Sequence, residues 1–112
     1  MIEHVRAAAL DLDPEPVAVG QIIDGTPTTA VSELDTFGSL DVGVWEMTAG
    51  AMSDTEADEL FVVIAGSAEV EYVDSGVRAT YGVGDVVQLH AGQRTVWRVA
   101  DRIRKVYLAP AP

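Results

Sequence analysis

Cysteine is absent from the whole 112-residue chain. Disulfide bonds, thiolate catalysis and cysteine-ligated zinc or iron–sulfur sites are therefore excluded. Basic residues are few. The chain contains 7 Lys and Arg and 18 Asp and Glu, which gives a net charge of −11 at pH 7. Such a charge repels phosphate backbones and anionic lipids, so we expect neither nucleic acid nor a membrane surface as a partner.

Long apolar runs are also missing. No stretch of 18 apolar residues occurs, and the short apolar patch at residues 7–10 ends at Asp11. We therefore expect neither a membrane span nor a signal peptide, and we place the protein in the cytoplasm. The hydrophobic share of 48% and the charged share of 22% predict one folded domain with its own core.

From residue 17 onward the chain is a series of short β-type runs closed by Gly, Pro, Asp or Ser. Residues 1–16 combine an apolar patch with Pro14, Pro16 and several acidic residues, which predicts an extended N-terminal arm. No segment has the period of an amphipathic helix. The predicted strands are 17–23, 28–34, 40–47, 59–65, 68–73, 77–81, 85–89, 95–99 and 102–108.

Residues 68–81 illustrate this pattern. Val70 and Tyr72 alternate with Glu69 and Glu71, and the segment 74–76 (Asp-Ser-Gly) predicts a tight hairpin turn. Many short strands separated by turns favour an antiparallel sandwich, jelly roll or closed barrel. The interior of such a barrel is a natural ligand pocket.

Two segments resemble the paired motifs of the cupin superfamily. The first runs from Gly50 to Gly66 and contains Glu59, and the second runs from Gly84 to Thr95. Within the cupins, the chain is most similar over residues 14–109 to the small single-domain group related to the cupin domain of (S)-ureidoglycine aminohydrolase. The residues that carry this likeness are Gly43-Val44-Trp45-Glu46, Asp58-Glu59, Trp97 and Arg104-Lys105-Val106-Tyr107. The resemblance implies an all-β, cupin-type antiparallel jelly-roll barrel at residues 17–112, behind the arm of residues 1–16.

The resemblance also implies a metal site of three histidines and one glutamate, but only the glutamate is present. Ser53, Thr55 and Thr95 stand at the histidine positions, and Glu59 at the fourth. One carboxylate with hydroxyl groups makes a poor site for zinc, nickel, manganese or iron. His4 in the arm and His90 at a turn do not replace the missing ligands. We therefore predict no metal and no cofactor.

Glu59 and Lys105 are the candidate catalytic residues. The resemblance implies that Glu59 points into the barrel with Phe61 on the same strand. A carboxylate there suits a general acid, a general base or an anchor for a cationic ligand. The alternative is a structural carboxylate satisfied by Lys105 or by backbone donors. Lys105 and Tyr107 share one face of the last strand, and whether Lys105 touches Glu59 depends on the strand register, which stays open.

The candidate ligand-binding residues are Trp45, Phe61, Thr95, Trp97 and Tyr107. Core packing is the alternative for the aromatic residues. The acidic stretch that contains Asp54, Glu56 and Asp58 would, in a strand, form a face opposite Glu59. We interpret it as a solvated acidic edge and not as a calcium site, because a strand supplies too few convergent oxygens.

Three functions follow from these observations. The first is a small barrel that binds a small polar organic ligand in its interior without the usual histidine-ligated metal. The second, implied by the resemblance, is a metal-dependent hydrolase acting on a ureido or amino-acid-derived compound, with a metal-free acid–base enzyme using Glu59 and Lys105 as a variant. The third is a non-catalytic homodimeric regulatory or interaction module joined by swapped arms. We expect a homodimer as the oligomeric state.

Overall fold

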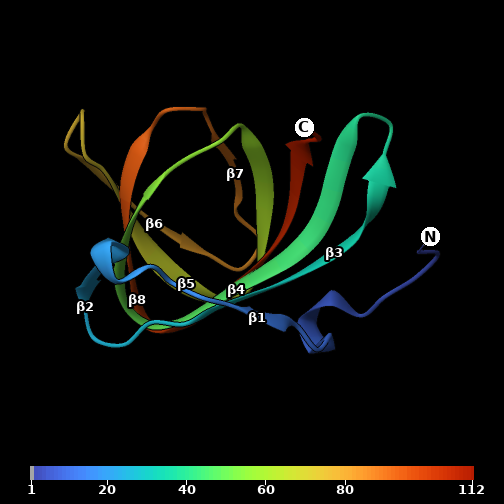
Figure 1. Cartoon of the computed structure of the whole chain (residues 1–112), viewed down its shortest axis with the longest axis horizontal. Helices are drawn as coiled ribbons and strands as arrows, with labels where there is room; N and C mark the ends of the chain where they lie inside the picture. Colours follow the sequence, from blue (N-terminus) through green and yellow to red (C-terminus); the bar gives the residue numbers. More distant parts are fainter. Residues whose placement is uncertain (1) are drawn as a thin grey trace.

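The computed structural model describes residues 2–112 and consists almost entirely of β-strands (Figure 1). The strands are β1 (Asp13–Glu15), β2 (Ile22–Asp24), β3 (Thr29–Phe37), β4 (Leu40–Thr55), β5 (Glu59–Tyr72), β6 (Val77–Gly82), β7 (Val86–Leu89) and β8 (Arg94–Pro110). Within these residues the helical segments are two 3-10 turns, η1 (Ala7–Ala9) and η2 (Val19–Gln21). Neither has the length or apolar character to cross a membrane.

All strand pairs are antiparallel. The order is β1-β3-β4-β8-β5-β6, with β2 added to β4 and β7 added to β5. The long strands β4, β5 and β8 lie side by side at the centre, and the shorter strands flank them. This arrangement confirms the predicted all-β jelly-roll barrel.

The three long strands each bend near their middle. The register shifts between Thr48 and Gly50 in β4, and between Val63 and Glu69 in β5. Because such irregularities increase the local bend and twist, the two halves of each strand enter two different layers. The core lies between these layers and includes the fully buried residues Met47, Phe61, Val63, Val70, Leu89 and Ile103.

These bends explain two differences between the predicted and the observed strands. The sequence predicts separate strands at 59–65 and 68–73 and at 95–99 and 102–108, whereas β5 and β8 each continue through the bend. The predicted strand at 17–23 is replaced by η2 and β2, so that prediction was wrong. The turn at 74–76 is confirmed, because Gly76 has a φ of 76° and its N–H donates to the Tyr72 carbonyl at 2.8 Å.

The N-terminal arm lies on its own barrel. Asp13 pairs with Val31 through β1 and β3. Arg104, only 8% exposed, donates from Nη1 to the carbonyls of Ala7 at 2.8 Å and Leu10 at 2.9 Å. The arm is thus partly extended and partly folded into η1, and the ion-paired guanidinium of Arg104 binds it to the barrel.

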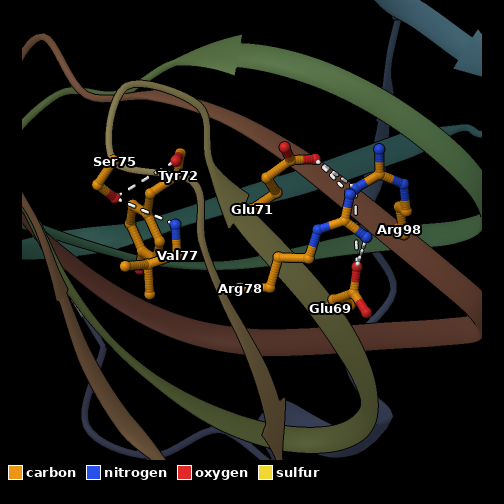
Figure 2. Close-up of polar contacts among 7 residues, drawn as sticks. All are labelled: Glu69, Glu71, Tyr72, Ser75, Val77, Arg78 and Arg98. Atoms are coloured by element: carbon orange, nitrogen blue, oxygen red, sulfur yellow. Dashed lines mark hydrogen bonds and ion pairs between the residues drawn. The ribbon is translucent and has the colours of Figure 1, made fainter.

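Charged residues cover the outer surface where β5, β6 and β8 meet (Figure 2). Arg98 on β8 donates to Glu71 at 2.7 Å, and Arg78 on β6 donates to Glu69 at 3.4 Å. These pairs are partly exposed, so each contributes about 0–1 kcal/mol to stability. Their position shows that the glutamates of the predicted alternation face solvent while Val70 faces the core.

Gly66 lies at the bend of β5, where the strand passes close to β8. Its φ is 69°, and a Cβ atom added there would lie 1.8 Å from the carbonyl oxygen of Arg102. Gly76 has nearly the same φ, but a Cβ atom there would meet no heavy atom within 4 Å. Glycine is therefore needed at position 66 for two reasons, the positive φ and the lack of space for a Cβ atom. At position 76 only the positive φ requires it.

We expect Gly66→Ala to lower the free energy of unfolding by more than about 3 kcal/mol, since it combines left-handed strain with a backbone clash. Gly76→Ala is the matched control and should cost about 1–2 kcal/mol, from strain alone. Urea unfolding followed by circular dichroism measures both values. Equal losses in the two variants would contradict the close approach of β5 to β8.

Candidate functional site

A cavity of about 290 Å³ opens between the two layers of the barrel. Its walls combine carboxylates, two indole rings, one lysine and one tyrosine. The lining residues are Glu15, Pro16, Val17, Gln21, Thr29, Val31, Trp45, Met52, Asp54, Glu56, Glu59, Trp97, Lys105 and Tyr107. Both layers, the arm and η2 therefore contribute to one space.

An ion pair lies in the wall of this cavity. Lys105 Nζ is 2.6 Å from Glu59 Oε2, and the lysine side chain is only 6% exposed. The same Nζ lies 4.6 Å, 4.5 Å and 4.8 Å from the ring centroids of Trp45, Phe61 and Trp97. The carboxylate and the three ring faces together compensate the desolvation of the ammonium group.

The strand register explains how these side chains meet. Lys105 on β8 stands opposite Trp45 on β4 and opposite Val63 on β5. Since side chains alternate along a strand, Lys105, Tyr107 and Trp97 all point inward from β8. Glu59 opens β5 and points inward on the same face as the buried Phe61, so the open question of contact between Glu59 and Lys105 is answered by a direct hydrogen bond.

Glu56 is held in place by two buried donors. Its Oε2 accepts hydrogen bonds from Thr95 Oγ1 at 2.6 Å and from Trp97 Nε1 at 3.0 Å. Glu56 belongs to the link between β4 and β5, and its backbone is bonded to Gln93 and Gly92 of the neighbouring turn. This link turns its side chain into the cavity.

The acidic stretch does not form the solvated edge that we expected. Residues 56–58 are not a strand, so strict alternation ends at Thr55 and both Asp54 and Glu56 line the cavity with Glu59. Asp58 alone remains exposed, and it accepts a hydrogen bond from the Ala91 N–H at 2.8 Å. A break in alternation has no local signal in the composition of this segment, which is why the sequence indicated the wrong face.

Two cavity groups have raised pKa values. Burial, together with the nearby charge of Glu56, raises the pKa of Asp54 to about 6, against a backbone hydrogen bond from Thr55 and the charge of Lys105. Burial also raises the pKa of Tyr107 to about 12, helped by surrounding carboxylates such as Glu33 and Glu59. Tyr107 therefore stays a neutral phenol at neutral pH, whereas Asp54 changes charge in the weakly acidic range.

The structure places the remaining predicted residues as follows. Trp45, Trp97 and Tyr107 lie in the cavity wall with Glu59 and Lys105. Phe61 is fully buried behind Lys105, and Thr95 is 1% exposed behind Glu56, so neither lines this cavity. Phe61 instead contacts the wall residue Lys105, and Thr95 donates a hydrogen bond to the wall residue Glu56. The residues that the sequence did not single out include Glu15, Gln21, Thr29 and Met52.

The donor set does not suit the metal that the cupin resemblance implies. Ser53 Oγ donates to the Gln21 carbonyl at 3.4 Å, Thr55 is exposed, and Thr95 donates to Glu56. Among residues 2–112 no three His, Cys, Asp or Glu side chains are arranged to hold a metal ion. In addition, a lysine ammonium already pairs with Glu59, and no imidazole reaches the cavity. These residues do not fit a histidine-type metal centre.

The sequence of residues 34–107 matches the EutQ-like cupin domain family. The chain belongs to this family. No protein of curated function matches it. The cupin superfamily predicted from the two motifs is thereby confirmed.

Solved structures show the same fold. A protein assigned as ethanolamine utilization protein Q from Salmonella typhimurium is 21% identical over 74% of this chain and 69% of its own, with a TM-score of 0.64. EutQ from Clostridium difficile is 19% identical over 96% and 86%, with a TM-score of 0.73. A protein of unknown function from Pseudomonas syringae is 28% identical, with a TM-score of 0.78, and the match spans 93% of this EutQ-like cupin domain but only 46% of that chain.

The raised pKa of Asp54 predicts that the free energy of unfolding depends on pH. Because the pKa of about 6 in the folded protein lies above the ordinary aspartate pKa of 3.8, the folded state keeps, between these two pH values, a proton that the unfolded chain has released. The charged Asp54 carboxylate therefore lowers the free energy of unfolding, and this effect is complete above about pH 6. It disappears as the pH falls towards 4. We expect Asp54→Asn to raise the free energy of unfolding by about 1–2 kcal/mol at neutral pH, allowing for solvent screening.

Urea unfolding of the wild type and of Asp54→Asn at a series of pH values measures this difference. Asp58→Asn is the matched control, because Asp58 is an exposed carboxylate of the same stretch. A gain for Asp54→Asn that is just as large near pH 4 as at neutral pH would contradict the burial of this carboxylate.

Proposed function

We propose that this EutQ-like cupin domain binds a small polar organic ligand in the cavity between its layers. The observation that carries the proposal is the cavity itself, in which Glu59, Lys105, Tyr107 and two tryptophans converge from three strands. Ligand pockets in proteins have volumes of about 300–1,000 Å³ and are mostly apolar with a few placed polar groups. A cavity of about 290 Å³ is at the small end of this range, which favours a small ligand.

The enzymatic alternatives have less support. A ureidoglycine aminohydrolase-like activity would need a metal centre for which the cavity supplies no imidazole. A metal-free acid–base reaction would use Glu59 and Lys105. These two groups are hydrogen-bonded to each other, and the carboxylate of Glu59 neutralises the buried ammonium group of Lys105. We therefore rank ligand binding above catalysis.

Filling the cavity tests the proposal. Val31 on β3 lines the cavity, and Val31→Phe adds volume there. We expect this variant to lose binding of any bound metabolite by at least about tenfold, since a tenfold loss requires only about 1.4 kcal/mol. Native mass spectrometry and ligand-observed NMR with a metabolite library detect the binding. Thr36→Phe, at the exposed end of the same strand, is the matched control and should bind as the wild type does.

Equal retention of ligands by Val31→Phe and by the wild type would show that binding takes place elsewhere on the molecule. The folding of both variants is checked by circular dichroism, since an enlarged side chain in a tight wall destabilises by about 1–3 kcal/mol.

A second proposal concerns self-association, which the outer face of the barrel supports. Cross-strand pairing places Val86, Val62, Val106 and Val44 in one row across β7, β5, β8 and β4. Leu60, Leu108 and Val42 form the next row. We call these seven residues the aliphatic face. It carries no charge in a chain with a net charge of −11. Val86 and Leu60 are 63% and 43% exposed, whereas Val44 is fully buried, so the open part of the face lies around Val86 and Leu60. A second copy is the partner that we propose for it, as a symmetric homodimer.

Charge introduced into this face should abolish the dimer. We expect wild type to sediment as a dimer, and the variant Leu60→Asp/Val86→Asp to sediment as a monomer, in sedimentation equilibrium. Val77→Asp is the control, since Val77 is 55% exposed on β6, outside the aliphatic face. A monomeric wild type, or a dimer that survives the double substitution, would contradict the proposal.

A further inference from the structure

We infer that the ligand of this cavity is a small organic cation, most simply a protonated primary amine with a short carbon chain. This inference rests on the proposed function and assigns a chemical class to the ligand. It follows from the charges in the cavity, from the engagement of its lysine and from the oxygen atoms that its carboxylates leave free.

The charges of the cavity do not balance. Its wall contains Glu15, Asp54, Glu56 and Glu59, against a single cation, Lys105. Glu59 neutralises Lys105, and no cationic side chain of residues 2–112 is ion-paired with the other three carboxylates. A bound monocation would relieve the repulsion between Asp54 and Glu56, whereas an anion would add to it.

Lys105 is not available to an anionic ligand. Its ammonium group is 2.6 Å from Glu59 and lies within 5 Å of three ring centroids. A carboxylate or phosphate would have to displace Glu59 while approaching two further carboxylates. Although the cavity contains a lysine, this lysine does not make the cavity a binding site for anions.

The carboxylates are placed to accept hydrogen bonds from an ammonium group. Glu56 engages Oε2 with Thr95 and Trp97, which leaves Oε1 without a hydrogen-bond partner among the described residues. Asp54 engages Oδ1 with the Thr55 N–H, which leaves Oδ2 equally free. A primary ammonium has three N–H donors and can use both oxygens. Trp45 and Met52 in the same wall supply apolar surface for a carbon chain.

Amine binding should weaken in acid. The charged groups that act on Asp54 are Glu56 in the link, Glu59 on β5 and Lys105 on β8. Arg94 on β8 lines a neighbouring hollow with Asp54, but its guanidinium group is paired with Asp74. With a pKa of about 6, Asp54 loses most of its charge by pH 5, while an alkylamine remains protonated throughout. If binding needs the charged carboxylate, affinity should fall about tenfold between pH 7.5 and pH 5.

The test uses three probes of similar size and different charge: n-butylamine hydrochloride, 1-butanol and sodium pentanoate. Both tryptophans of the chain line the cavity, so intrinsic fluorescence reports on binding there. We expect saturable binding of butylamine, stronger than that of the other two, and weaker at pH 5. Asp54→Asn should weaken it about tenfold and remove the pH dependence, and Glu56→Gln should also weaken it. Asp58→Asn, outside the cavity, should bind as the wild type does.

Three other results of this binding test would each contradict a particular part of the proposal. Preferred binding of butanol or pentanoate overturns the cationic class and leaves ligand binding standing. Absence of saturable binding for all three probes overturns both. Butylamine binding that is unchanged in folded Asp54→Asn and in folded Glu56→Gln assigns it to the acidic surface in general and overturns the cavity site. Circular dichroism establishes that the variants are folded.

Discussion

The burial of the Lys105 ammonium group is the constraint around which the interior is organised. A charge in this position is stable only if an opposite charge and polarisable surfaces surround it. Glu59 supplies the charge, and Trp45, Phe61 and Trp97 present ring faces at similar distances. Trp45 and Trp97 therefore both surround the ammonium group and line the cavity.

This arrangement needs strands that enter both layers of the barrel. Lys105 and Trp97 are on opposite sides of the bend in β8, and Trp45 and Asp54 are on opposite sides of the bend in β4. A straight strand would place its inward side chains along a single layer. The bends fold the sheet into two facing layers, and Gly66 permits the close approach of β5 to β8.

The chain shares its fold with EutQ proteins, and in its cavity carboxylates outnumber cations. A lysine already neutralised by Glu59 leaves the carboxylates of Asp54 and Glu56 as the groups open to a ligand. The arm, bound by Arg104 and paired through β1, closes one side of this space with Glu15 and Val17. The attached arm is therefore part of the cavity wall.

The resemblance to cupins, and not the sequence pattern, implied the inward position of Glu59, Lys105 and Tyr107. The sequence alone determined the all-β class, the turns and the shared face of Lys105 and Tyr107. These features depend on alternation and turn residues, which are local properties of the chain. Only the tertiary structure decided that β5 and β8 run unbroken through their bends, that Glu59 touches Lys105, and that Asp54 and Glu56 face inward. Contact between groups 46 residues apart depends on strand register. The direction of Glu56 depends on a link whose conformation is set by hydrogen bonds to a distant turn, and neither is encoded in the spacing of neighbouring residues.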